Sequence, residues 1–269
     1  MSSSSPENKV AFVIASCDKY SDLWSSLFGQ IFKYWPDIPY RIYLIANHKR
    51  YDDPRVTTLL AGDDLDWSST VLKSINQLQE QYVLFWVDDA FLRNKVDTDR
   101  ISSLVHWFIV GSYNFLRMRP NPKPKKWSHN AIGILVPEQA YRVSLFATLW
   151  NVDLLKRILL QGESAWQFEV NGSERSKNYD HFYCTRDEIF NYWHGVERGV
   201  WIRPTAKALE RSGYHLDYQS RRCMSRSENI GLIYRSFKSW VLHLIPEQRR
   251  ADALRCVRAC YYRLGLRKP

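Results

Sequence analysis

The 269-residue sequence lacks the long apolar runs and the short motifs that assign many proteins to a class. No segment approaches the roughly 20 apolar residues of a membrane-spanning helix. Residues 1–7 have neither the basic start nor the apolar stretch of a secretory signal. Neither GxGxxG nor GxxxxGKS occurs, so the sequence indicates neither a dinucleotide fold nor a P-loop kinase. We therefore expect a cytoplasmic protein.

Cysteine is also scarce. The five cysteines are an odd number, lie far apart in the chain and form no CxxC pair: Cys17, Cys184, Cys223, Cys256 and Cys260. This pattern does not indicate a zinc site, and we expect reduced thiols. The last two lie four residues apart on an expected helix, where packing explains them better than a metal does.

Acidic residues are scarce only near the end of the chain. After residue 200 there are 15 Lys and Arg against 5 Asp and Glu, whereas the chain up to residue 200 holds 23 of each, so the whole net charge of +10 lies in the last quarter. A hydrophobic content of 45% is enough for one large domain or for one domain with an appendage. We expect a disordered N-terminus over residues 1–8, a domain over 9–210 and a basic, mainly helical extension over 211–269.

The order of the expected elements predicts an α/β fold. Four segments have the apolar, β-branched and aromatic composition of strands, namely residues 10–16, 41–46, 56–61 and 82–87. A helix is expected from Asp22 to just before Pro36, and another after an N-cap at Ser68 or Ser69. Further along, residues 98–109 are expected to be helical and 114–119 extended. This alternation indicates a mixed, mainly parallel sheet flanked by helices.

Two adjacent carboxylates, Asp88 and Asp89, follow the most apolar of these strands directly. Ligands of open α/β sheets bind beyond the carboxyl ends of the strands. Two like charges side by side repel, so a cation or the hydroxyls of a ribose would stabilise them. In the alternative interpretation, Asp88 caps a turn and Asp89 is simply solvated.

The first strand ends in Ser16-Cys17-Asp18, whose short polar side chains suit a nucleobase or a ribose, although Asp18 could equally cap a turn. Residues 120–127 are rich in lysine and have prolines at alternate positions, which excludes a helix and an inner strand. That segment is either a solvated connection or a mobile basic flap over phosphates.

Three later residues are candidates for chemistry. Ser164 is an expected helix N-cap, which places Glu163 at the start of the helix and Glu169 within it, near Trp166. A carboxylate beside an indole in a cleft tends to have the raised pKa of a general base, but solvated glutamates near caps are also common. His194 could complete a metal site begun by Asp89, or be an ordinary structural histidine.

Several blocks taken together resemble a family of bacterial GT-A-like glycosyltransferases found among lipopolysaccharide and capsule assembly enzymes. The blocks are residues 15–20, 62–64 with Trp67, 82–92, 141–151 and 162–169, and the likeness spans roughly residues 9–205. The resemblance implies a GT-A-like, Rossmann-like fold and transfer of a sugar from a nucleotide-sugar donor to a glycan or a lipid-linked acceptor.

The resemblance also implies roles for the acid pair. Asp88 would contact the ribose or the sugar, and Asp89 would bind a divalent cation, Mn²⁺ or Mg²⁺, that bridges the two phosphates. Ser16, Asp18 and Asp64 would line the nucleoside pocket. The motif here reads Val-Asp-Asp, without an acid at its first place, so metal dependence is less secure than in an Asp-x-Asp enzyme.

An inverting transferase needs a carboxylate base, for which Glu163 is the first candidate and Glu169 the second. A retaining enzyme would not need this base, and the sequence does not distinguish the two. Arg142, which lies among apolar neighbours, is a candidate phosphate contact or the partner of a structural acid.

The basic tail has three interpretations. Its arginines and aromatic residues fit an amphipathic segment on an anionic membrane surface, a stripe packed on the domain, or a nucleic-acid contact. The leading hypothesis is a cytoplasmic glycosyltransferase, peripheral to the inner membrane. The alternatives are a noncatalytic nucleotide- or sugar-binding protein of the same fold and, less favoured, a metal-dependent nucleic-acid-binding protein.

Overall fold

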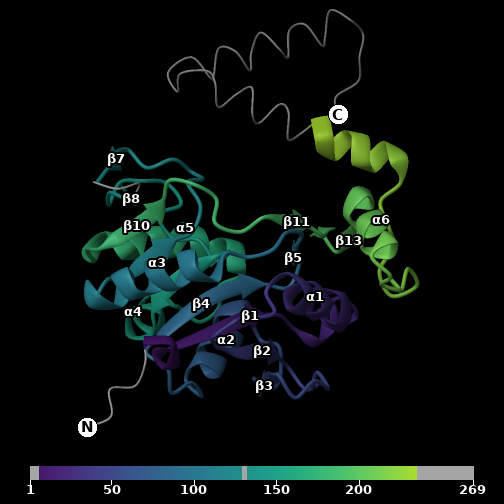
Figure 1. Cartoon of the computed structure of the whole chain (residues 1–269), viewed down its shortest axis with the longest axis horizontal. Coiled ribbons are helices and arrows are strands. Elements are labelled where there is room, and N and C mark those ends of the chain that lie inside the picture. Colours follow the sequence, from purple (N-terminus) through teal and green to yellow (C-terminus); the bar gives the residue numbers. More distant parts are fainter. Residues whose placement is uncertain (1–5, 129–131, 235–269) are drawn as a thin grey trace, which may run out of the picture.

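The computed structural model describes residues 6–128 and 132–234, which form a nine-stranded mixed sheet with helices on both faces (Figure 1). The strand order is β3-β2-β1-β4-β9-β6-β10-β8-β7. The strands are β1 Val10–Ala15, β2 Arg41–Ala46, β3 Val56–Leu60, β4 Tyr82–Val87, β6 Phe115–Arg117, β7 Lys126–Trp127, β8 Ile132–Ile134, β9 Thr148–Asn151 and β10 Phe182–Thr185. The predicted mixed, mainly parallel sheet is confirmed.

Two short ribbons, the helices α1 to α6 and a helical segment over residues 226–234 complete the described fold. β5 Ala90–Leu92 pairs with β11 Tyr192–His194, and β12 Val196–Glu197 pairs with β13 Val200–Trp201. The α-helices are α1 Ser21–Tyr34, α2 Trp67–Ile75, α3 Thr98–Val110, α4 Val152–Ile158, α5 Ala165–Arg175 and α6 Arg203–Arg211. Short 3-10 turns span Pro6–Lys9, Asp18–Tyr20 and Ser176–Asn178. α6 and the β12–β13 ribbon lie at the α1 end of the molecule, and β7 and β8 lie at the other end (Figure 1).

Strand direction brings the carboxyl ends of β1 and β4 to one edge of the sheet. β3, β2, β1 and β4 are mutually parallel. β9 runs against both of its neighbours, β4 and β6, and β8 runs against β10 and β7. Because the β1–β4 pairing extends from Val10 opposite Tyr82 to Ala15 opposite Val87, the two strands end level with each other.

Side-chain alternation along β1 divides the interior into two cores. Every residue of β1 is buried. Val10, Phe12 and Ile14 belong to the core beneath α1 and α3, whereas the alternate residues face the core beneath α2, α4 and α5. Burial on both faces explains why the sequences of β1 and β4 are continuously apolar and do not alternate apolar with polar residues.

The helices follow the predicted bounds closely, with one correction. α1 covers the expected stretch after Ser21 and buries Trp24, Phe28 and Ile31 at helical spacing. The expected N-cap of α2 at Ser68 or Ser69 is wrong. The cap is Asp66, whose side chain accepts a hydrogen bond from the Ser69 backbone N–H, a stronger pairing because the acceptor is charged.

The expected N-cap of α5 is confirmed. Ser164 and Gln167 form a reciprocal capping box, in which each side chain bonds the backbone N–H of the other.

Parts of the expected organisation lie outside the described residues. In the predicted disordered N-terminus, the 3-10 turn Pro6–Lys9 is described and residues 1–5 are not. In the predicted extension, residues 226–234 are helical, but residues 235–269, which carry most of the basic tail, are not described. No helix among the described residues is long and apolar enough to cross a membrane. The division of the chain near residue 210 stays a prediction.

Candidate functional site

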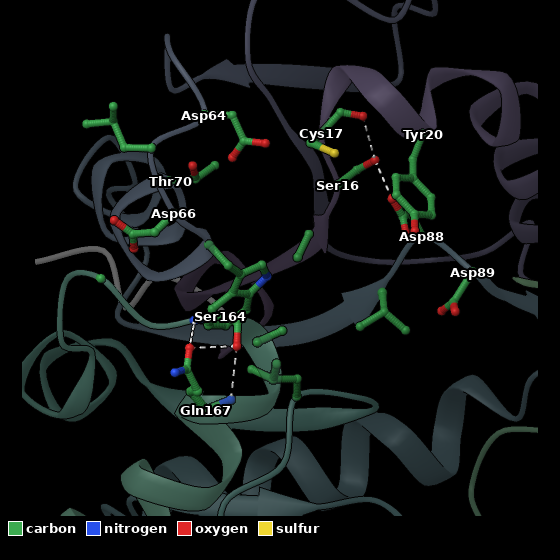
Figure 2. Close-up of a pocket in the computed structure, with 17 residues that line it drawn as sticks. Ser16, Cys17, Tyr20, Asp64, Asp66, Thr70, Asp88, Asp89, Ser164 and Gln167 are labelled. Carbon is green, nitrogen blue, oxygen red and sulfur yellow. Dashed lines mark hydrogen bonds between the residues drawn. The ribbon is translucent and has the colours of Figure 1, made fainter. Parts of the chain in front are cut away.

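A cavity of about 600 Å³ opens at the carboxyl ends of β1 and β4, between α2 and α5 (Figure 2). It is lined by Ala15, Ser16, Cys17, Tyr20, Asp64, Leu65, Asp66, Trp67, Thr70, Val87, Asp88, Asp89, Leu145, Gly162, Ser164, Ala165 and Gln167. Ser16, Tyr20 and Asp88 lie together on one side, while Asp64, Asp66 and Thr70 lie on the other. The structure thus brings four predicted site residues together: Ser16, Asp64, Asp88 and Asp89.

The turn that carries the acid pair is fixed by two hydrogen bonds to its backbone carbonyls. The indole N–H of Trp86 donates to the carbonyl of Ala90 at 2.9 Å, and the Gly195 N–H donates to the carbonyl of Asp89 at 2.7 Å. Trp86 is fully buried, with ring centroids of Phe146 at 4.6 Å and Phe190 at 5.0 Å. A core side chain therefore sets the position of both carboxylates.

Asp88 is held by a short chain of hydrogen bonds. The Ser16 hydroxyl donates to Asp88 Oδ2 at 2.6 Å and accepts from the Trp24 indole N–H at 2.8 Å. Burial and the charge of Asp89 raise the pKa of Asp88 to about 8, although the Ser16 bond and the charge of Arg221 oppose the rise. In the absence of a bound cation, Asp88 therefore holds a proton at neutral pH.

Asp89 lies beside His194. Its Oδ2 is 3.6 Å from His194 Nδ1, and His194 Nε2 is 3.8 Å from Glu197 Oε2. Burial raises the pKa of Asp89 even though His194 favours the charged form. Over residues 6–128 and 132–234, no three His, Cys, Asp or Glu side chains converge closely enough to hold a metal ion. The protein thus offers two adjacent donors rather than a complete metal cage.

The cavity lining is acidic. Four carboxylates face it, and no Lys or Arg is among the lining residues. Asp66 is engaged as the cap of α2, since it accepts from the backbone and the hydroxyl of Ser69 at 2.8 and 2.7 Å. Asp64, Asp88 and Asp89 remain, and any of them that is ionised would repel an anionic ligand.

An aromatic side chain and an unpaired hydroxyl form the α2 side of the cavity. Trp67 packs on Phe168, with 5.4 Å between ring centroids. Thr70 is 5% exposed, and its Oγ1 has no hydrogen-bond partner in the described part of the chain. A flat apolar surface with a nearby polar group suits a planar heterocycle.

Asp18 does not line the cavity. Its carboxylate accepts hydrogen bonds from the backbone N–H groups of Asn47, His48 and Lys49, and its own N–H donates to the Asn47 side chain. Burial opposes ionisation, but the bonds from Lys49 and His48 prevail and lower the pKa of Asp18. The observed geometry is that of the capping alternative, which ties the loop after β1 to the loop after β2.

The two candidate bases lie beside the cavity without lining it. Arg175 donates to both oxygens of Glu163 at 2.8 and 2.6 Å, and Asn171 donates to it at 2.8 Å. The hydrogen bonds from Arg175 and Asn171 lower the pKa of Glu163 against the opposing effect of burial. Glu169 accepts from the Leu145 N–H at 3.0 Å.

Arg142 is 2% exposed and donates to the backbone carbonyls of Leu135, Ser176 and Tyr179. Its guanidinium also stacks on the Phe182 ring, 4.0 Å from the centroid. Burial lowers the pKa of Arg142 to about 10. These contacts connect the 135–143 loop to the end of α5, and the lining of the cavity does not include Arg142.

Arg221, which the sequence did not single out, connects the C-terminal segment to the cavity wall. It is 6% exposed and donates to both carboxylate oxygens of Asp22 at 2.8 and 2.9 Å. It also donates to the carbonyls of Lys19 and Gly199, each at 3.1 Å, and lies 4.3 Å from the centroid of the Tyr20 ring. The partners are 199 residues apart in sequence, so no local pattern reveals the contact.

No protein-family model matches the chain, and no curated protein matches it by sequence. Two solved structures of S. aureus TarS 1–349 are similar, one in complex with UDP-GlcNAc and one in complex with UDP. The first is 12% identical with a TM-score of 0.49, over 71% of this chain and 59% of TarS 1–349. The second is 11% identical with a TM-score of 0.49, over 70% of this chain and 61% of the other.

The bifunctional IspDF from Campylobacter jejuni is also similar, at 10% identity and a TM-score of 0.42, over 70% of this chain and 52% of its own. This chain spans about three fifths of the TarS chains that it matches.

We predict that Arg221→Ala lowers the free energy of unfolding by about 3 kcal/mol, because it leaves Asp22 partly buried without its partner. The neighbouring Arg222→Ala is the matched control, since Arg222 is 60% exposed in its pair with Glu228 and should change stability little. Urea denaturation of both variants measures the difference. Equal effects of the two substitutions would contradict the assigned role of Arg221.

We also predict a pH-dependent stability difference between the wild type and Asp88→Asn. The folded-state pKa of Asp88 is raised from 3.8 to about 8, so the folded state holds a proton that the unfolded state releases. The stability contributed by this group is full below about pH 4 and is lost as the pH rises through about 8. Asp88→Asn should therefore gain stability over the wild type as the pH increases, by at least about 1 kcal/mol at pH 8. Urea denaturation with a chelator present checks this, and a difference independent of pH would contradict it.

Proposed function

We propose that the protein is a glycosyltransferase that moves a sugar from a nucleotide-sugar donor to an acceptor hydroxyl. The observation that carries the proposal is the acid pair, Asp88 and Asp89, at the carboxyl end of β4 inside a cavity of about 600 Å³. This is where open α/β sheets bind ligands, and the volume suits a ligand of nucleotide size.

The proposed donor lies across the cavity. Trp67 and the Thr70 hydroxyl suit the base, and Asp64 offers a carboxylate to a base N–H or a ribose hydroxyl. Asp88, held by Ser16, accepts hydroxyl groups of the ribose or the sugar. Arg142 and Asp18 are left out of this pocket because their polar groups already bind backbone partners.

A divalent cation fits the donor set of this site. Asp89 and His194 would hold it, and two protein donors are what Mg²⁺ or Mn²⁺ commonly uses when phosphate oxygens supply further ligands. When bound, such a cation offsets the negative charge of a diphosphate leaving group. The acidic lining supports this proposal, because its ionised carboxylates would repel an uncompensated diphosphate.

In the proposed transfer, the acceptor oxygen forms a bond to the anomeric carbon as the bond from that carbon to the phosphate oxygen breaks. The electron pair of the broken bond leaves with the nucleoside diphosphate, and the acceptor proton passes to a carboxylate base. Glu163 is the proposed base for an inverting reaction, with Glu169 as the second candidate. For Glu163 to accept the proton, its ion pair with Arg175 must first open.

The acceptor class rests on the sequence resemblance alone. We propose a glycan or a lipid-linked saccharide of the lipopolysaccharide or capsule type. Docking of the basic tail on the inner membrane belongs to the same proposal, although residues 235–269 lie outside the described chain.

The second candidate is a noncatalytic nucleotide- or sugar-binding protein of the same fold. The specific observation in its favour is the Glu163–Arg175 pair, whose hydrogen bonds keep the pKa of Glu163 low and occupy its oxygens. A binder would leave a nucleotide sugar intact, whereas a transferase would release the nucleoside diphosphate.

We expect one nucleotide from a panel of UDP, GDP, CMP, dTDP and ADP to raise the melting temperature, and to do so only with Mn²⁺ or Mg²⁺. Ligand at 100 times its dissociation constant adds about 2.7 kcal/mol of stability, which differential scanning fluorimetry detects. Asp89→Ala should abolish the shift. Asp63→Ala is the control, because Asp63 is exposed in the same loop as Asp64 but does not line the cavity. The absence of a shift with every nucleotide would overturn the proposal.

A further inference from the structure

A second cavity, of about 460 Å³, adjoins the acid pair. It is lined by Arg93, Glu188, Phe190, Asn191, Tyr192 and His194. The shared border is His194, which lines this cavity while its Nδ1 lies 3.6 Å from Oδ2 of Asp89 in the first cavity. The two cavities therefore meet at the residues proposed to hold the cation.

The ribbon of β5 and β11 forms the frame of the second cavity. His194 pairs with Ala90 and Tyr192 pairs with Leu92, and the Arg93 N–H continues the ladder by donating to the Asn191 carbonyl at 3.0 Å. Because alternate residues of a strand point to the same face, Tyr192 and His194 lie side by side. This ribbon begins at the turn of the acid pair, so the cavity is fixed relative to Asp89.

The lining is rich in hydrogen-bonding groups. Arg93, Glu188 and Asn191 are exposed, and within the described ranges neither Arg93 nor Glu188 forms an ion pair. The Arg93 guanidinium lies 5.7 Å from the centroid of the Trp193 ring. The Tyr192 ring is partly buried against Phe146, with 4.3 Å between centroids. Donors, acceptors and a fixed aromatic ring in one cavity match the hydroxyl groups and the apolar ring face of a saccharide.

We propose that this second cavity binds the saccharide acceptor. The inference rests on the proposed function, because transfer requires the attacking hydroxyl to lie about 3 to 3.5 Å from the anomeric carbon, and hence requires two sites that meet. Neither the second cavity nor a third one of about 530 Å³, which contains Trp107 and Tyr183, shares a lining residue with the first. The His194–Asp89 contact singles out the second cavity, and its polar lining favours a sugar over a lipid tail.

Saccharide binding to two variants tests the proposal. The probes are glucose, galactose, mannose, N-acetylglucosamine, glucosamine, glucuronic acid and their β1,4-linked disaccharides. Saturation-transfer NMR and calorimetry measure their binding to the full chain. Each measurement is made with and without the nucleotide and the cation that bind in the melting experiment. Arg93→Ala and Asn191→Ala should each lower the affinity for the saccharide that the wild type binds by tenfold or more. The affinity for nucleotide should stay within twofold of the wild-type value. Arg211→Ala, an exposed arginine at the end of α6, is the matched control and should change neither affinity.

The outcomes separate the two proposals. Unchanged saccharide affinity in both variants, or no binding by any of the saccharides, overturns the acceptor site even if nucleotide binds. A wild type that binds saccharide in an Arg93-dependent manner but binds no nucleotide supports the saccharide site and overturns the transferase. Thermal melting of each variant without ligand shows whether it is folded, since these exposed side chains should leave the melting temperature unchanged.

Discussion

The hydrogen bond from the Trp86 indole to the Ala90 carbonyl is the contact on which the rest of the site depends. It closes the turn that carries Asp88 and Asp89, and it does so from the centre of an aromatic core. The same turn starts β5, whose pairing with β11 brings His194 to Asp89. One buried side chain thus aligns the acid pair, its histidine neighbour and both adjoining cavities.

Charge is the second constraint, and it acts through the same turn. Two adjacent carboxylates in a partly buried site repel each other, and burial raises the pKa of both. Ser16, His194 and Arg221 each favour the ionised forms, but Asp88 still holds its proton at neutral pH. A cation bound between the two carboxylates would displace this proton and remove their mutual repulsion. This is the physical basis of the proposal that a nucleoside diphosphate binds together with a metal.

The fold and the acid pair could be predicted from the sequence because both depend on local patterns. Apolar runs bounded by turn residues predicted β1 to β4, and the position of Asp88 directly after one run predicted its place at the sheet edge. The roles of Asp18, Glu163 and Arg142 could not be predicted in this way. Their hydrogen-bond partners lie up to 37 residues away in the case of Arg142, and only the folded chain shows that these groups are already engaged. Arg221 is the extreme case, since its partner is 199 residues away.

The most direct test of the account is the number of protons released when nucleotide and cation bind. Calorimetry in two buffers of different ionisation enthalpy gives this number, and Asp88→Asn provides the baseline for protons that come from the nucleotide itself. If ligand binding ionises Asp88, the wild type should release close to one proton more than Asp88→Asn at pH 7. Equal proton release from the two proteins, with tight binding in both, would show that the acid pair does not exchange its proton for a cation and would contradict the account.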